Sequence, residues 1–329
     1  MLMENPVDRA RLRIGRLERL QATMRAQGLE ACLLFNEPNV RYASGASAMP
    51  IWSNTTFVRC ALVPAEGRPV LFEHPNSMHL FRGIEADVRP MHAWEFYDDT
   101  AAHAAIFARQ TVAALRELGV TPGRLAVDRL GTPGFLALQR EGIAIVDAAP
   151  VTTVARGIKT PEEVALFELN GAILMEMLAH FERAIAPGVR ERDLLAVLAD
   201  TLLRRGGEHL ATSTAHDWLL AMREMVRPGI TCGELAAKAP RLPRKFMPQR
   251  YEVMIHSIGL EEESPSVAYP DDPQPNGDRV LQKNMTLVVE LYCGEVGGRD
   301  GVKLGDQVLV TSQGVKVLVP YPCCDLLLR

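Results

Sequence analysis

A carboxylate inside an apolar run is the feature that most restricts how this chain folds. The run Met285–Leu291 is typical of a buried strand, and Glu290 stands between Val289 and Leu291 within it. Burying a carboxylate is costly unless a cation or a hydrogen-bond donor faces it. His256, just before the turn at Gly259, is a candidate partner because a neutral imidazole is a common metal ligand. The pair predicts a metal site, although a lone histidine at a strand end is more often a hydrogen-bonded core residue.

Size and composition describe an ordinary globular protein. A length of 329 residues is enough for two domains, and 47% hydrophobic with 23% charged residues is typical of soluble proteins. The net charge of -4 and the lack of a basic stripe argue against a nucleic-acid partner. No stretch reaches the roughly 18 apolar residues that a membrane span needs. Six cysteines without CxxC spacing indicate reduced thiols and a cytoplasmic protein.

The first 150 residues alternate between helical and strand patterns. Apolar residues at helical spacing predict an amphipathic helix over 8–27. The turn at 64–67 predicts a hairpin between strands 57–63 and 69–72. Further strands are expected at 30–35, 124–127 and 143–146, and further helices at 100–118 and 133–140. We therefore expect a first domain over residues 1–155 that buries its own core.

A second unit is predicted to begin near Thr160. Thr160 suits the N-cap, Pro161 the first helical position, and Glu163 the third, which can complete a capping box. This helix should end near residue 185. Helices are then expected at 193–205, 215–225 and 232–238, and strands at 253–256, 286–290 and 307–311. The fold class is α/β (α+β), with a second domain over residues 156–329.

Other candidate residues carry weaker signals. Glu263 follows Glu261 and Glu262, a run that is more often a solvated acidic turn. His209 stands beside the helix stop Gly206-Gly207 and is more often a loop histidine than a ligand, although it can line a pocket. The pair Asp271-Asp272 in a proline-rich loop is expected to be solvated. The run 301–311 reads by itself as a plain arm of a β-hairpin.

Several runs together resemble the creatinase/prolidase/methionine-aminopeptidase family, which is peptidase family M24 with the pita-bread fold. The run 39–45 resembles a strand-turn signature of the family's N-terminal domain, and 156–163 resembles the entry to its catalytic domain. The run 256–265 resembles the family's histidine motif, with Ser257 in place of the usual glycine. The Glu290 strand and the run 301–311 resemble the two C-terminal metal motifs. The runs 206–212 and 248–254 are most similar to the branch that contains the dimethylsulfoniopropionate lyase.

The resemblance implies a site for two divalent ions, Mn, Fe, Co or Zn, held by two Asp, one His and two Glu. His256 and Glu290 match the histidine and the first glutamate, and Glu263 matches an acidic residue that orients substrate or moves a proton. Gly305 stands where the second glutamate belongs, and Asp306, one position on, should point to the other face of its strand. No pair of Asp residues lies between Asp217 and Asp271, and the connection 205–214 is too short for the family's Asp-bearing strands.

The matches and the gaps lead to three functional hypotheses. The first is a metal-dependent hydrolase of the Xaa-Pro peptidase type whose two-metal catalysis is impaired or absent. The second is a non-catalytic relative that binds a ligand or forms dimers. The third is a lyase acting on a sulfonium substrate. The expected partners are a small peptide or small molecule and a second copy of the chain, with no nucleic acid and no membrane.

Overall fold

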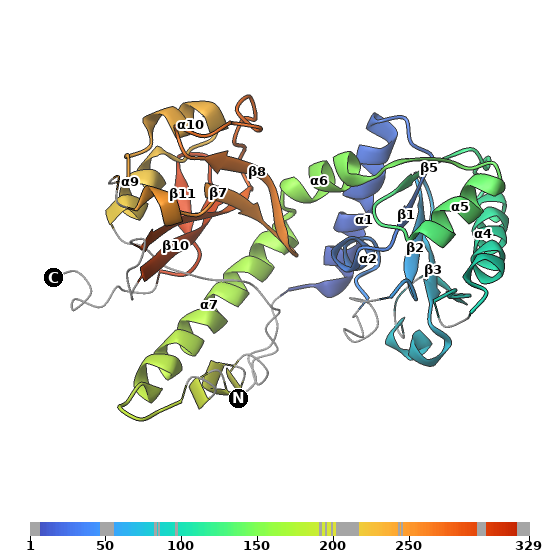
Figure 1. Ribbon diagram of the computed structural model, residues 1–329, viewed down its shortest axis with the longest axis horizontal. Helices are drawn as coiled ribbons and strands as arrows, with labels where there is room; N and C mark the ends of the chain where they lie inside the picture. Colours follow the sequence, from blue (N-terminus) through green and yellow to red (C-terminus); the bar gives the residue numbers. More distant parts are fainter. Residues whose placement is uncertain are drawn as a thin grey trace. The chain divides into compact units, whose positions relative to one another are not determined.

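The computed structural model describes residues 7–320 except for 47–55, 82, 83, 85, 96, 97, 191, 192, 195, 199, 202–216, 243, 245 and 295–300. The chain divides into two compact units (Figure 1). One comprises Arg9–Arg156, and the other comprises Gly157–Arg329 together with Met1–Asp8. Both units combine helices with a sheet, so the α/β class expected from the sequence is confirmed.

The unit Arg9–Arg156 is built on a mixed six-stranded sheet. Its strand order is β4-β3-β2-β1-β5-β6. The strands are β1 (Ala31–Leu34), β2 (Cys60–Pro64), β3 (Val70–Glu73), β4 (Asp87–Pro90), β5 (Arg124–Val127) and β6 (Ala144–Asp147). The expected hairpin is present, because β2 and β3 pair in antiparallel fashion. The pairs β1–β5, β5–β6 and β3–β4 are parallel.

Helices surround this first sheet. They are α1 (Arg9–Ala26), α2 (Glu37–Ser44), α4 (Thr100–Glu117), α5 (Thr132–Arg140) and α6 (Ala149–Gly157), with a 3-10 helix η1 (Pro75–Phe81). Phe107 of α4 and Leu138 of α5 are fully buried and belong to one apolar core with Leu33, Leu62 and Leu125 of the strands. The unit therefore has its own hydrophobic core, as its alternating sequence pattern indicated.

The run 39–45 is helical rather than a strand and turn. Pro38 lies in the first turn of α2, where its missing N–H and fixed φ suit a helix start. Gly45 ends the helix with φ 71°, and its N–H donates to the carbonyl oxygen of Arg41. A Cβ at this position would lie 2.3 Å from the side chain of Arg13. The glycine that suggested a turn after a strand is in fact a left-handed helix cap.

The second unit begins with α7 (Pro161–Ala184), which has the predicted capping box. The Thr160 hydroxyl accepts a hydrogen bond from Glu163 N at 3.2 Å, and Glu163 Oε2 accepts one from Thr160 N at 2.9 Å. By length and composition alone α7 could also cross a membrane, but the core helix of a globular domain passes the same test. Its residues Leu166, Phe167 and Ile173 are buried in this structure.

A five-stranded sheet forms the centre of the second unit, in the order β11-β10-β9-β7-β8 (Figure 1). The strands are β7 (Val253–Ile258), β8 (Glu262–Ala268), β9 (Thr286–Gly294), β10 (Gly301–Val310) and β11 (Val315–Val317). The described helical segments beside α7 include α9 (Asp217–Met225), α10 (Cys232–Lys238) and the 3-10 helix η2 (Met247–Gln249). Every pair of neighbouring strands is antiparallel.

The two faces of this sheet are covered by different helices. Leu287 and Val289 of β9 pack in one core with Met222 of α9 and Leu235 of α10. Val288, one residue out of step, packs instead with Phe167 of α7. Side chains alternate between faces along a strand, so Glu290 shares the face of Val288, which we call the α7 face.

The strand and helix predictions hold for most elements, with differences at their ends. No strand was expected at 262–268, where β8 lies. The strand β10 covers most of the run 301–311 that reads as a hairpin arm and so begins before the shorter strand expected at 307–311. The helix predicted over 193–205 lies partly outside the described residues. Three cysteines, Cys32, Cys60 and Cys232, are buried free thiols, in line with the expectation of reduced cysteines.

Candidate functional site

His256 and Glu290 lie together on the α7 face. His256 is directly opposite Val288 in the register of β7 and β9, so Glu290 is its diagonal neighbour two residues further along. The His256 Nε2 atom is 3.7 Å from Glu290 Oε1, and the two side chains are 11% and 8% exposed. The structure therefore brings together the two residues that the sequence singled out first.

The histidine's other nitrogen fixes which tautomer faces the carboxylate. His256 Nδ1 lies 3.1 Å from the carbonyl oxygen of Ser257, which can only accept, so a hydrogen bond there requires a proton on Nδ1. In the neutral ring Nε2 then presents a lone pair toward the Glu290 carboxylate. Two electron-rich atoms in a buried site favour a cation or a proton between them. The pair fits one bound cation.

Gly305 is the residue that the family resemblance places at a further ligand position. In the antiparallel pair of β9 and β10, Gly305 is directly opposite Glu290. Directly opposed residues project to the same face of a sheet, so a side chain at position 305 would lie beside the Glu290 carboxylate. Glycine supplies no ligand atom there. Because of this register, the site lacks a side chain at the position next to Glu290 where a two-metal site of the family has one.

Asp306 points away from that site. It is opposite Val289, whose side chain packs in the core with Met222 of α9. We call this side of the sheet the α9 face. The Asp306 Oδ2 atom accepts a hydrogen bond from Arg223 Nη1 of α9 at 2.7 Å. The nearest acidic side chain along β10 is therefore engaged on the opposite side of the sheet, as alternation along a strand predicts.

Glu263 is buried rather than part of a solvated turn. It lies in β8, and its Oε2 atom accepts a hydrogen bond from Lys159 Nζ at 2.7 Å. The two side chains are 5% and 1% exposed. Gly259 leaves room for this carboxylate, because a Cβ at that position would lie 2.1 Å from Glu263 Oε1. The neighbouring Glu261 and Glu262 are exposed, as an acidic turn would be.

The remaining predicted site residues fall where nothing is described. His209 and the connection 205–214 lie outside the described residues. Within the described chain no three side chains of His, Cys, Asp or Glu come close enough to hold one metal ion. The described residues thus fit one cation at His256 and Glu290 but do not fit a pair of ions, which needs several anionic ligands to balance the charge.

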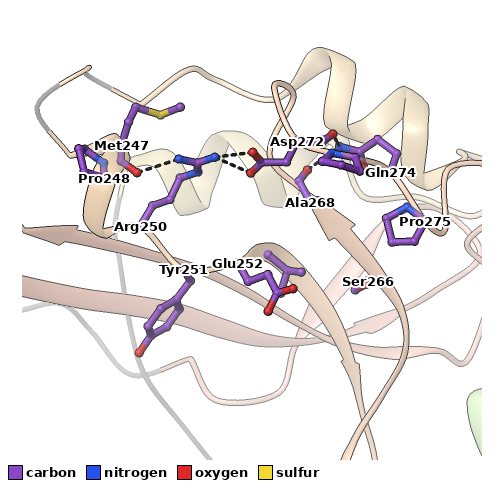
Figure 2. A pocket seen from close by; sticks show the side chains of 12 residues that line it. Met247, Pro248, Arg250, Tyr251, Glu252, Ser266, Ala268, Asp272, Gln274 and Pro275 are labelled. Atoms are coloured by element: carbon purple, nitrogen blue, oxygen red, sulfur yellow. Dashed lines mark hydrogen bonds and ion pairs between the residues drawn. The ribbon is translucent and has the colours of Figure 1, made fainter.

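A pocket of about 680 Å³ opens on the same unit, and no local sequence pattern predicts it (Figure 2). Ser266, one of its lining residues, is directly opposite His256 in the register of β7 and β8. Ser266 therefore lies on the α7 face, like His256 and Glu290. The proline-rich loop that contains Asp271-Asp272 forms part of the lining, together with residues of the run 248–254. The sequence singled out both segments but contained no signal that they meet.

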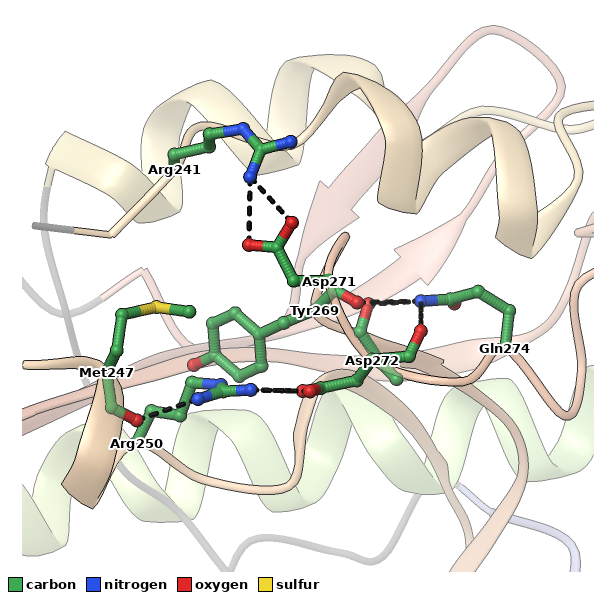
Figure 3. Close-up of polar contacts among 8 residues, drawn as sticks. Arg241, Met247, Arg250, Tyr269, Asp271, Asp272 and Gln274 are labelled. Atoms are coloured by element: carbon green, nitrogen blue, oxygen red, sulfur yellow. Dashed lines mark hydrogen bonds and ion pairs between the residues drawn. The ribbon is translucent and has the colours of Figure 1, made fainter. Parts of the chain in front are cut away.

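Asp271 is exposed, as expected, and Asp272 is partly exposed, and each is also paired with an arginine. Arg241 Nη1 donates to both carboxylate oxygens of Asp271 at 2.7 and 2.8 Å. Arg250 Nη2 donates to both oxygens of Asp272 at 2.6 and 2.5 Å (Figure 3). Proximity in the fold, which composition does not reveal, supplies both partners.

Family models match both units. The model for the creatinase/prolidase N-terminal domain matches residues 16–158, and the model for metallopeptidase family M24 matches residues 211–312. The M24 model covers the part of the chain that carries His256, Glu290 and Gly305, and the resemblance to family M24 seen in the sequence motifs is confirmed. Prolidases of this family depend on divalent metal ions.

The similar proteins include both lyases and peptidases. The chain is 29% identical to a dimethylsulfoniopropionate lyase DddP of Roseobacter denitrificans and 28% identical to one of Roseovarius nubinhibens, each match covering 96% of this chain and 87% of the lyase. A prolidase from Thermococcus sibiricus has the same fold, with a TM-score of 0.71 at 14% identity over 93% of this chain and 96% of the other. An X-Pro aminopeptidase from Thermotoga maritima gives 0.70 at 15% identity over 93% and 97%.

The lyase alignment also reveals a difference in length. It runs over 388 positions, whereas this chain has 329 residues, so at least 59 positions hold a residue of the lyase and none of this chain. A protein similar along nearly its whole length therefore carries segments that this chain lacks.

Proposed function

We propose that this chain is a member of family M24 in which two-metal catalysis is impaired or absent. The observation that carries the proposal is Gly305, which stands directly opposite Glu290 and offers no ligand atom. Removing one residue that is hydrogen-bonded to a metal ligand, without binding the metal itself, lowers metal affinity about 10–100-fold. Losing ligands themselves should lower it much further. The site that remains, His256 and Glu290, supports weak binding of one ion and mostly water as its other ligands.

The shorter length of this chain relative to the lyase supports the same proposal. We infer that part of the segment missing relative to the lyase lies between α7 and α9, where the connection 205–214 leaves little chain for strands bearing two Asp residues. In this proposal the chain keeps the family's architecture and acts by binding a small peptide or small molecule. A second copy of the chain is the expected partner, which light scattering after size-exclusion chromatography would test.

The direct experiment is metal content. The full chain is loaded with Mn²⁺, Co²⁺ or Zn²⁺ in turn, dialysed, and analysed by mass spectrometry for metal per chain. We expect far less than one ion per chain after dialysis. Two ions per chain that survive dialysis would overturn the proposal, because only a complete set of anionic ligands holds two ions so firmly.

A lyase reaction is the second candidate, since two lyases align along almost the whole chain. Release of dimethyl sulfide from dimethylsulfoniopropionate would reveal it, whereas cleavage of a proline dipeptide would reveal a peptidase. In either residual activity, Glu263 would orient substrate or move a proton, held in place by Lys159. A catalytic role for His209 stays a prediction.

A further inference from the structure

The pocket beside η2 has the size of a small-molecule site and walls of mixed character. Its volume of about 680 Å³ falls within the range of ligand pockets in proteins. Met247, Pro248 and Pro273 supply apolar surface, and the ring of Tyr251 forms one wall (Figure 2). Tyr251 is stacked on Tyr292 of β9, with ring centroids 5.8 Å apart and an interplanar angle of 18°. The charged groups of the lining differ in whether they have a partner of opposite charge.

Arg250 provides the positive charge of the pocket, and that charge is already engaged. Its Nη1 donates to the carbonyl oxygen of Met247 at 2.7 Å, and its Nη2 donates to the carboxylate of Asp272 (Figure 3). The guanidinium carbon lies 5.0 Å from the centroid of the Tyr269 ring. The remaining nitrogen, Nε, is buried and has no hydrogen-bond partner among the described residues. The carboxylate of Asp272 thus already balances the one positive charge of the pocket lining.

The loop that faces Arg250 is held in place by its own hydrogen bonds. Gln274 Nε2 donates to the carbonyl oxygens of Tyr269 at 2.8 Å and Asp272 at 3.1 Å (Figure 3). Arg241 holds the adjacent Asp271 from outside the pocket. Because these contacts already hold the loop in place, binding a ligand costs little loss of loop flexibility, and this preserves affinity.

Glu252 provides a negative charge that nothing in the described chain neutralises. It is exposed, it lines the pocket, and no hydrogen bond or ion pair joins it to a described residue. Figure 2 shows it between Tyr251 and Ser266. Two carboxylates, Glu252 and Asp272, thus stand against one guanidinium, so the pocket has a net negative charge. Its field attracts cations.

We propose that this pocket binds an organic ammonium ion, a protonated amine attached to a compact apolar body. The N–H groups of the ammonium would donate to Glu252, and the apolar body would lie against Tyr251 and the prolines. A hydrogen bond between two charged groups is stronger than a neutral one, so the amine and Glu252 form the selective contact. The proposal is independent of the proposed function, because it needs no metal and no catalysis.

The test is titration calorimetry of the dialysed, metal-free full chain with benzylamine near pH 7, where the amine is protonated. We expect saturable binding with one site per chain. Glu252→Gln should weaken it about tenfold, the size of a lost hydrogen bond to a charged group. Glu224→Gln, an exposed glutamate of α9 outside the pocket, makes the same charge change and should leave binding unchanged. Circular dichroism checks that both variants are folded.

Two matched probes make the result specific. Benzoate has a similar ring with the opposite charge, and we expect no binding by it. Benzyltrimethylammonium keeps the positive charge but has no N–H to donate, and we expect weaker binding than for benzylamine. The proposal is overturned if benzylamine fails to bind up to about 10 mM, a concentration that would reveal even millimolar affinity. It is equally overturned if benzoate binds as well, or if Glu252→Gln has no effect.

Discussion

Lys159 Nζ lies 2.7 Å from Glu263 Oε2, and the two side chains are almost entirely buried. The lysine lies just before α7, and the glutamate lies in β8 at the edge of the second sheet. The ion pair therefore fastens the entry of the second unit to a strand about 100 residues further along the chain. In a buried pair each charge depends on the other, because neither has water to solvate it.

Removing either partner of this pair should destabilise the second unit strongly. Lys159→Met leaves the Glu263 charge buried without its lysine, and Glu263→Gln leaves the lysine without its carboxylate. We expect each to lower the free energy of unfolding by about 3–5 kcal/mol. The double variant Lys159→Met with Glu263→Met should cost less than the sum of the two. Urea denaturation of the three variants measures this, and single variants as stable as the parent would refute it.

Gly305→Glu should restore little activity. The new carboxylate would project beside Glu290 and add a third ligand, so retention of Co²⁺ should rise measurably above that of the parent chain. Hydrolysis of a proline dipeptide should stay near background, since on the proposed function the two Asp ligands of the family pattern are still absent. Gln313→Glu, at an exposed position in the turn before β11, adds a carboxylate outside the site and is the control. A large gain in activity from Gly305→Glu alone would mean that the site is more complete than proposed.

Any weakly bound ion should depend on both His256 and Glu290. We expect His256→Ala and Glu290→Gln each to abolish the uptake of Co²⁺ that is seen when the ion is present in excess. His92→Ala, in the other unit, removes a half-buried histidine and should leave uptake unchanged. Visible absorption of the Co²⁺ complex follows the binding, and equal absorption in all three variants would exclude this assignment.

The buried cysteines should resist alkylation. Burial raises the pKa of Cys32 to about 12 and that of Cys232 to about 11. The thiolate is the reactive form, so at pH 8 both groups remain unreactive thiols while the chain is folded. Iodoacetamide should label them in urea but only slowly in buffer, and the rate in buffer should rise as pH increases toward those values. Peptide mass spectrometry measures the labelling at each cysteine. Rapid modification of Cys232 in the folded protein would contradict this.

Local patterns predicted most of the elements. The capping residues Thr160 and Glu163 fixed the start of α7, and apolar runs located β7, β9 and most strands of the first sheet. The strand β8 was missed because its sequence begins with two acidic residues, Glu262 and Glu263, and contains Pro265, both typical of turns. It forms because the sheet supplies a partner strand and Lys159 supplies a counter-charge, and neither is visible in a local window.

In the candidate site, too, local patterns were predictable and contacts between distant segments were not. Alternation along a strand was enough to separate Gly305 from Asp306 and to place Glu290 in the interior. Pairing between distant segments was not predictable in this way. Arg223 with Asp306 and Arg250 with Asp272 join residues 83 and 22 positions apart, and the pocket exists only because such segments meet.

The register of β10 limits how mutation can restore ligands to this site. Sliding β10 by one residue against β9 would replace Gly305 by Asp306 beside Glu290 and so supply a carboxylate without any substitution. The same slip would turn Val308 and Val310 out of the α9 core, because every side chain of a strand changes face together. An insertion or deletion just before β10 therefore offers no easy route back to a fuller set of ligands. The apolar residues that secure the strand also keep its aspartate out of reach.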